Sequence, residues 1–170
     1  MYLNNCPCGS KKKYLSCCEP FITGKQTPKT PEELMRSRYT AYTLADIDYI
    51  KKTMKGEALI DFNEKDAKDW AKRVTWIKLH VFLSNFENSD TGFVEFEATF
   101  LDGYQLKSIY EKSKFILENG NWYYVSGTHI QDKYRERVIS RNQACPCGSE
   151  RKFKNCHGLQ LQPKYQSRDR

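Results

Sequence analysis

The sequence predicts an α+β fold in which helices pack on a curved antiparallel sheet. The spacing of its apolar residues follows a helical period from residue 31 to about residue 70 and alternates from residue 74 onward. A block of helical pattern followed by a block of strand pattern is typical of an α+β domain rather than of a parallel α/β sheet. Charged residues make up 29% of the 170 residues and hydrophobic residues 39%, a composition typical of neither a disordered chain nor a membrane-spanning one.

Helices are expected in the segment with the helical period. Thr30 precedes Pro31 and two glutamates, which is the pattern of an N-cap with proline at the first helical position. Asp46 is expected to cap a second helix, and a third begins after Asn63. The expected helices cover 31–44, 47–54 and 64–70.

Four strands are expected after the helices, because apolar and polar residues alternate. The side chains expected to face the helices are Ile77, Leu79, Val81 and Leu83 in 74–83, Val94, Phe96, Ala98 and Phe100 in 92–101, and Ile109, Phe115 and Leu117 in 104–117. Trp76, Lys78, His80 and Phe82 are expected on the opposite face of the first strand. Asn119-Gly120 predicts a tight hairpin turn into a fourth strand at 122–126.

Seven cysteines lie in two groups, one at each end of the chain. Both groups begin Cys-Pro-Cys-Gly-Ser. After eight residues that separate the second cysteine from the third ligand position, one group continues with Cys-Cys and the other with Cys-His. This is an internal duplication of a four-ligand set. The two predicted sets are Cys6, Cys8, Cys17 and Cys18, and Cys145, Cys147, Cys156 and His157.

The duplicated pattern predicts two structural zinc sites, hence two Zn²⁺ per chain. Tetrahedral zinc takes four sulfur or nitrogen ligands, and a site that fills all four positions leaves none open for catalysis. Ser10 and Ser149 are expected either to bond a thiolate sulfur or to cap the basic turn that follows. The weighed alternative is redox chemistry at the adjacent Cys17 and Cys18, although a disulfide between neighbours is strained.

The cysteine segments resemble a known motif. CPCGSERKFKNCHG (145–158) resembles the SEC-C motif at the C-terminus of the SecA translocation ATPase, and CPCGSKKKYLSCC (6–18) resembles a second copy with Cys18 in place of histidine. With segments 34–54 and 111–127, the chain resembles the YchJ family of small bacterial proteins. That resemblance implies a cystatin-like, cone-shaped roll of the nuclear-transport-factor-two and ketosteroid-isomerase kind. Tyr110 departs from the family pattern, where histidine is expected before Glu111.

The expected organisation has five parts. They are an N-terminal zinc knuckle (1–20), an α+β middle domain (28–130), a basic linker helix (131–141, packed through Tyr134, Val138 and Ile139), a C-terminal zinc knuckle (142–160) and a basic tail (161–170). Each knuckle is the short segment that contains one of the two four-ligand sets.

A pocket at the mouth of the cone is a candidate ligand site. Glu111 and Ser113 share the face of Ile109 and so are expected to point toward the helices. A buried carboxylate can act as a general base, but a structural ion pair with Arg36 or Arg38 is the favoured interpretation. His80 and His129 are interpreted as ordinary polar residues.

The favoured function is a zinc-binding, non-enzymatic adaptor for a protein partner. SecA's tail contacts the SecB chaperone, with roles at lipid and ribosome, which suggests a chaperone, translocation or ribosome-associated partner. The residues expected to bind the partner are Lys11, Lys12, Lys13, Tyr14, Arg151, Lys152, Phe153 and Lys154. With no secretory signal evident at the N-terminus, a cytoplasmic location is expected.

Two alternative functions remain open. Residues 133–170 contain ten Lys and Arg against three acidic residues, whereas the rest of the chain balances at 18 against 18, so the basic C-terminal region favours nucleic-acid binding. The other alternative is small-molecule binding or catalysis in the pocket.

Overall fold

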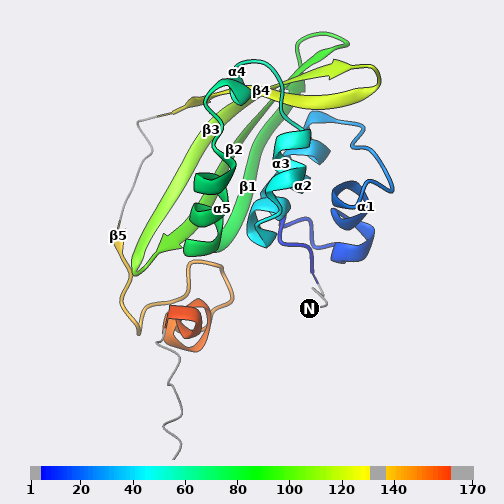
Figure 1. Cartoon of the computed structure of the whole chain (residues 1–170). Helices are drawn as coiled ribbons and strands as arrows, with labels where there is room; N and C mark the ends of the chain where they lie inside the picture. Colours follow the sequence, from blue (N-terminus) through cyan, green and yellow to red (C-terminus); the bar gives the residue numbers. More distant parts are fainter. Residues whose placement is uncertain (1–4, 131–136, 162–170) are drawn as a thin grey trace, which may run out of the picture.

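The computed structural model describes residues 5–130 and 137–161 and has the predicted α+β fold (Figure 1). Four antiparallel strands form a sheet in the order β1-β2-β3-β4, and helices cover one of its faces. The strands are β1 (Thr75–Phe86), β2 (Thr91–Asp102), β3 (Gln105–Glu118), β4 (Asn121–His129) and β5 (Arg137–Val138). The α-helices are α1 (Glu19–Ile22), α2 (Pro31–Leu44), α3 (Ile47–Lys52), α4 (Glu57–Ile60) and α5 (Glu64–Arg73).

Side-chain caps determine where the longer helices begin. Thr30 Oγ1 accepts a hydrogen bond from the Glu33 backbone N–H over 3.1 Å at the start of α2. Asp46 and Asn63 cap α3 and α5 in the same way, each over 3.1 Å. The expected starts of the helices are therefore confirmed. The short helices α1 and α4 lack a side-chain cap, and the sequence pattern did not predict them.

The sheet alternates as predicted over β2 and β3. Val94, Phe96, Ala98 and Phe100 are all buried in β2, and Glu111 and Ser113 lie with Phe115 on the helix-facing side of β3. Asn119 and Gly120 both have positive φ, 53° and 77°, as a tight hairpin turn of this type requires.

Strand β1 departs from the prediction at two register shifts. One lies between Trp76 and Lys78, the other between Val81 and Leu83. Each shift inserts a residue and reverses the alternation of the strand. Trp76 therefore faces the helices instead of the outer face. Leu83, expected to point inward, is 52% exposed.

The linker predicted as a basic helix at 131–141 also differs from the prediction. Arg137–Val138 form β5, which pairs with the start of β3, so the helix expected there is wrong for its described part. Ile139 is buried as expected, whereas Val138 is exposed. Residues 131–136 and most of the basic tail lie outside the described residues.

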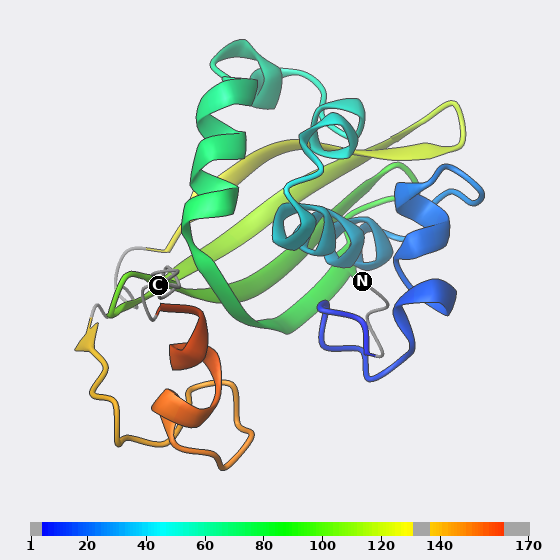
Figure 2. The same ribbon diagram turned by 60° about the horizontal axis from the view of Figure 1, so that its bottom comes forward.

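The two knuckles contact different parts of the middle domain. The C-terminal knuckle is lowest in Figure 1, whereas the N-terminal knuckle lies at the right beside α2, and both are in view in Figure 2. In the N-terminal knuckle, η1 (Tyr14–Ser16) precedes α1; in the C-terminal knuckle, η3 (Phe153–Asn155) precedes η4 (His157–Leu161). The C-terminal knuckle packs beneath the β2–β3 hairpin through a small apolar cluster that is separate from the main core. Across the described ranges, no helix combines the length and apolar character needed to cross a membrane.

Candidate metal centres and the central pocket

The four N-terminal cysteines converge as predicted, with their sulfur atoms within 4.8 Å of one another. Cys8 Sγ lies 3.6 Å from Cys17 Sγ, which is 3.9 Å from Cys18 Sγ. The Ser10 hydroxyl lies 3.1 Å from Cys17 Sγ, so the expectation of a serine–sulfur hydrogen bond is met. Cys6, Cys8 and Cys18 are buried, which leaves this site shielded from solvent on most sides.

The C-terminal set converges in the same way. His157 presents Nδ1 to the cluster, 3.2 Å from Cys145 Sγ and 3.4 Å from Cys156 Sγ. Cys147 Sγ lies 3.7 Å from Cys156 Sγ, and the Ser149 hydroxyl lies 3.4 Å from Cys156 Sγ. The histidine thus occupies the position that Cys18 occupies in the first copy.

The two copies share their backbone geometry, which extends the duplication from sequence to structure. Gly9 and Gly148 have φ of 76° and 80°, a conformation that glycine adopts without strain. The residues two positions later, Lys11 and Glu150, also have positive φ, 62° and 60°. In each copy the first cysteine N–H donates to a carbonyl six residues on, over 2.8 Å. The resulting loop points the ligand side chains inward.

The electrostatics of the N-terminal set fit a metal ion. Hydrogen bonds from Cys18 and Cys6 hold the pKa of Cys8 far below the usual thiol range. At Cys6, a hydrogen bond from Cys18 favours the thiolate, but the neighbouring Cys8 and burial prevail and raise the pKa to about 11. Thiols this close cannot all ionise without a compensating positive charge. A divalent cation would supply it, so each cluster could bind a metal ion through its four residues.

Helix α2 supports the N-terminal knuckle. Arg36 donates from Nη1 to the Cys8 carbonyl over 2.8 Å, and Thr40 Oγ1 lies 3.7 Å from Cys6 Sγ. A Cβ on Gly9 would lie 3.3 Å from the carbonyl oxygen of Leu79 in β1. The N-terminal site is therefore packed against α2 and β1 of the middle domain and is not a separate, loosely attached module.

Phe153 attaches the C-terminal knuckle and corrects one expectation. It is fully buried against Leu101, Leu106 and Ile139 at the β2–β3 hairpin, so it cannot belong to an exposed partner-binding surface. The apolar hairpin end needs a large side chain to cover it, and Phe153 provides one. Its counterpart Tyr14 is half-buried beside the N-terminal cysteines.

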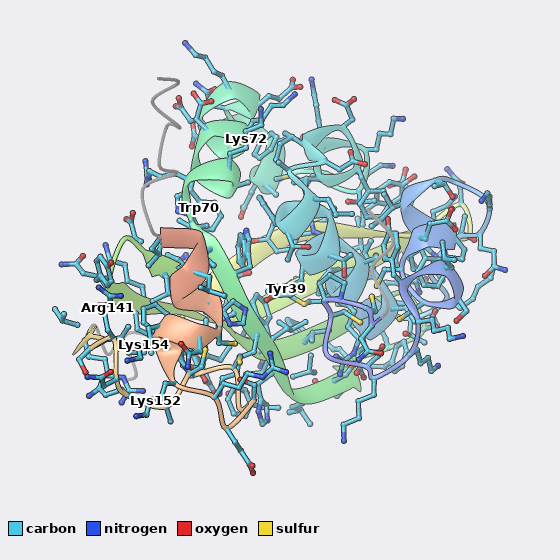
Figure 3. The ribbon with its side chains drawn as sticks, turned by 90° about the horizontal axis from the view of Figure 1, so that it is seen from below. Tyr39, Trp70, Lys72, Arg141, Lys152 and Lys154 are labelled. Carbon is cyan, nitrogen blue, oxygen red and sulfur yellow. The ribbon has the colours of Figure 1, made fainter. Side chains whose placement is uncertain are left out.

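The basic residues of both knuckles do reach solvent. Figure 3, seen from below, shows Arg141, Lys152 and Lys154 projecting from the C-terminal side of the molecule. The exposed residues among those predicted to bind a partner are Lys11, Lys12, Lys13, Arg151 and Lys152.

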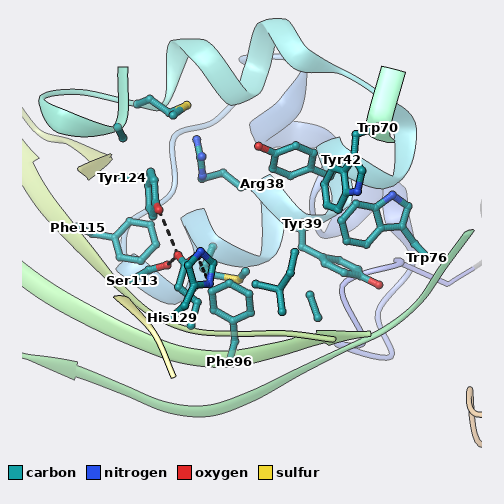
Figure 4. Close-up of a pocket in the computed structure, with 16 residues that line it drawn as sticks. Arg38, Tyr39, Tyr42, Trp70, Trp76, Phe96, Ser113, Phe115, Tyr124 and His129 are labelled. Carbon is teal, nitrogen blue, oxygen red and sulfur yellow. Dashed lines mark hydrogen bonds and ion pairs between the residues drawn. The ribbon is translucent and has the colours of Figure 1, made fainter. Parts of the chain in front are cut away.

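The predicted pocket lies between the helices and the sheet, and Glu111 is inside it (Figure 4). Ser113 Oγ and Tyr124 Oη both donate to Glu111 Oε1, the latter over 3.2 Å. His129 Nδ1 lies 3.9 Å from Glu111 Oε2, which places it closer to the pocket than the sequence suggested. His80, in contrast, stacks on Phe82 of its own strand, outside the pocket.

The prediction that Glu111 forms an ion pair with Arg36 is wrong. Arg38, the other predicted partner, lies in the same pocket as Glu111 but does not contact its carboxylate directly. Arg36 points to the N-terminal knuckle, where it pairs with Glu32 over 2.8 Å. Arg38 enters the pocket but donates from Nη1 to the Ile50 carbonyl and to Thr53 Oγ1, both over 2.7 Å. Two positions on a helix differ by about 200° in direction, so the two arginines face different neighbours.

Sequence reasoning missed the importance of Tyr124 in this pocket. Arg38 Cζ lies 4.7 Å from the centre of the Tyr124 ring, so Tyr124 contacts both the buried cation and, through its hydroxyl, Glu111. Burial raises the pKa of the Tyr124 hydroxyl above its usual range and keeps it a donor. Alternation along β4 was the available signal, since Trp122 and Tyr124 share a face.

The fold and these sites define a class of protein: an α+β domain with a cysteine-rich loop at each end that could bind a metal ion. Residues 30–127 match the family model for the YchJ middle NTF2-like domain, and residues 141–159 match the SEC-C motif. The chain belongs to the YchJ family with this NTF2-like middle domain. The resemblance indicated by its sequence is thereby confirmed.

Two solved structures are similar to the chain. A SEC-C motif containing protein from Rhodopseudomonas palustris, solved in solution, is 38% identical with a TM-score of 0.69 and covers 75% of this chain and 99% of its own. A SEC-C motif containing protein from Psychrobacter arcticus, solved by crystallography, is 30% identical with a TM-score of 0.66, covering 93% of this chain and 97% of its own.

Proposed function

We propose that this protein is a zinc-binding, non-enzymatic adaptor whose two knuckles together bind a protein partner. The observation that carries the proposal is the repetition of one loop geometry at two places that are both in view from below (Figure 3), each copy with exposed basic side chains. A duplicated loop placed in this way suits a partner that is contacted at two points.

Zinc is the metal that the donor sets favour. Four sulfurs, or three sulfurs with one imidazole nitrogen, are the ligands of structural zinc sites. All four positions of each set are occupied by protein side chains, which supports a structural rather than a catalytic role. The serine hydroxyls beside Cys17 and Cys156 would stabilise thiolate charge in the bound state.

The partner is expected to present acidic surface. Lys12 and Lys13 in the first loop occupy the positions of Arg151 and Lys152 in the second, and all four are exposed. Exposed charges of one sign guide association with the opposite sign and set specificity more than raw affinity. An acidic chaperone, translocation component or ribosome-associated protein in the cytoplasm fits this surface.

Affinity capture with the zinc-loaded protein tests the proposal. Two charge-reversal variants, Lys12→Glu/Lys13→Glu and Arg151→Glu/Lys152→Glu, should each weaken capture of the same identified protein. Lys65→Glu/Lys68→Glu, on exposed positions of α5, is the matched control and should leave capture unchanged.

Nuclease treatment separates this function from nucleic-acid binding. The adaptor proposal expects the captured protein to remain after nuclease and to disappear in a Cys8→Ser/Cys147→Ser variant. Loss of capture on nuclease treatment would instead identify nucleic acid as the partner and overturn the proposal. Equal effects of the loop variants and the α5 control would overturn it as well.

A further inference from the structure

The pocket between the helices and the sheet is a cavity of about 280 Å³ that no metal-binding residue lines. Ligand pockets are usually roughly 300–1,000 Å³, so this cavity suits a small molecule. Its lining divides into two ends (Figure 4). Arg38, Glu111, Ser113 and His129 lie at one end with Tyr124 and Phe115, and Trp70, Trp76 and Tyr39 lie at the other.

Arg38 provides a buried cation at the polar end. The residue is only 7% exposed, yet both hydrogen bonds recorded for it use the same nitrogen, Nη1. In Figure 4 its guanidinium lies between the rings of Tyr124 and Tyr42, within the cavity. A guanidinium has further N–H donors, and a ligand oxygen can accept from them here.

Glu111 provides the acceptor at the same end. Ser113 and Tyr124 both donate to its Oε1, and the contact of Oε2 with His129 is long at 3.9 Å. Oε2 can therefore accept a short hydrogen bond from a ligand donor. Because Arg38 and Glu111 make no direct pair, each keeps bonding capacity directed to the cavity.

The charges of this pair restrict the ligand. One buried cation and one buried carboxylate already balance each other, and adding a net charge to a buried site is costly. A ligand that carries an acceptor for Arg38 and a donor for Glu111, with no net charge, satisfies both groups without such a cost.

The other end of the cavity favours a flat apolar body. Trp76 packs edge to face against Trp70 and Tyr39, with ring centres 5.1 and 5.3 Å apart. Trp76 Nε1 is buried and has no hydrogen-bond partner within the described part of the chain. Aromatic side chains in this arrangement accommodate a planar ring by stacking or edge contacts.

We propose that this cavity binds a small, flat molecule of no net charge whose polar end carries both an acceptor for Arg38 and a donor for Glu111. Two kinds of molecule share this chemistry: an aromatic amino acid, with its carboxylate and ammonium, and an aromatic lactam, with its carbonyl and N–H. The site is separate from both metal centres and adds a ligand-binding function to the proposed adaptor.

Calorimetric titration of the full chain with matched probes tests the proposal. L-Phenylalanine and 2-quinolone carry both groups, whereas 3-phenylpropionate lacks the donor and 2-phenylethylamine lacks the acceptor. At least one two-group probe should bind about tenfold more tightly than each single-group probe, because each hydrogen bond to a charged group contributes substantially. Whichever of L-phenylalanine and 2-quinolone binds more tightly identifies the type of ligand. Failure of both to bind, or equal binding of the single-group probes, overturns the proposal.

Variants locate the binding. Glu111→Gln should weaken the two-group probe about tenfold and leave the single-group acid unchanged or improved, since the carboxylate that repels it is gone. Glu97→Gln, on the outer face of β2, is the control and should change nothing. Should Glu111→Gln fail to fold, Tyr124→Phe serves instead, because it removes only the hydroxyl that holds Glu111. Unchanged probe affinity in the folded variant overturns the assignment.

Discussion

Arg36 donates a hydrogen bond to the carbonyl oxygen of Cys8 over 2.8 Å and so fastens the N-terminal cysteine loop to helix α2. The same guanidinium bonds Glu32 through Nε over 2.8 Å, which orients it along the helix. Arg38, two residues later, lines the central cavity. One helix thus contacts the first metal centre on one side and the pocket on another, and its residues can be tested separately.

Replacing Arg36 with alanine should weaken the N-terminal metal site alone. A hydrogen bond from a charged donor contributes roughly 1.5–3 kcal/mol, so release of zinc to a coloured chelator should accelerate about tenfold or more. The rate is measured in a Cys147→Ser background, in which only the first site remains. Arg73→Ala, at an exposed arginine of α5, is the control; equal rates in the two variants would contradict the role assigned to Arg36.

The two metal centres should be lost independently. The duplicated ligand sets predict two zinc ions per chain by native mass spectrometry, one in Cys8→Ser and one in Cys147→Ser. Because Cys8 is fully buried at the contact with α2, Cys8→Ser should lower the Tm of the middle domain more than Cys147→Ser does. Loss of both metals in either single variant, or the reverse order of Tm, would contradict separate sites with this packing.

The convergence of the two cysteine sets and the starts of the helices were predictable because their determinants are local. Metal ligands are recognised by residue type and spacing, and Thr30 or Asp46 caps a helix within three residues of itself. Asn119-Gly120 likewise encodes its own turn. These features depend on no distant part of the chain.

What the sequence could not predict depends on contacts between distant segments. The register shifts beside Trp76 and Leu83 reverse the alternation of β1, and a period of two contains no sign of them. Phe153 reads as an aromatic residue in an exposed loop, because nothing local indicates that Leu101 and Leu106 leave an apolar site for it. The roles of Arg36 and Arg38 could be separated only once the inward face of α2 was known.

Phe153→Ala should detach the C-terminal knuckle from the sheet. Removing a fully buried phenylalanine typically costs about 3–5 kcal/mol, since its apolar contacts are lost and a cavity remains. Tyr14→Ala, the equivalent change in the other copy, removes a half-buried side chain and should cost about 1 kcal/mol. Urea unfolding measures both. Similar losses in the two variants would contradict the unequal packing of these aromatic residues.

Stability should fall in alkali because of Tyr49. Burial raises its pKa to about 12 from 10.0, although its hydrogen bond with Ser37, 2.7 Å long, opposes this. The folded state therefore retains a proton that the unfolded state has lost between these values, so stability is complete below pH 10 and is lost as pH rises toward 12. At about 1.4 kcal/mol for each pH unit, the titration of Tyr49 lowers the free energy of unfolding by roughly 2–3 kcal/mol over this range.

Urea unfolding across this alkaline range checks the prediction. Tyr49→Phe keeps the ring and removes the titrating hydroxyl, so its stability should depend less steeply on pH by about one proton. Tyr104→Phe, at an exposed tyrosine, is the matched control and should keep the slope of the unmodified protein. An unchanged slope in Tyr49→Phe would show that Tyr49 does not titrate with unfolding.

Gly127→Ala should disrupt the polar end of the pocket although no charged residue is replaced. Gly127 pairs with Ser113 across β3 and β4, so a side chain there would point into the cavity. A Cβ at this position would collide with the Glu111 carboxylate and lie 2.6 Å from Tyr124 Oη. Overpacking of this kind costs about 1–3 kcal/mol, and the displaced carboxylate should no longer face Arg38.

The neighbouring residue on β4 provides the control for this change. Thr128 pairs with Lys112 and so points away from the pocket, and Thr128→Ala should alter neither stability nor ligand binding appreciably. Gly127→Ala, in contrast, should bind L-phenylalanine or 2-quinolone at least about tenfold more weakly, because Glu111 can no longer accept from the probe while Arg38 donates to it. If Gly127→Ala binds the two-group probe as well as Thr128→Ala does, the position of the Glu111 carboxylate does not govern what the cavity accepts.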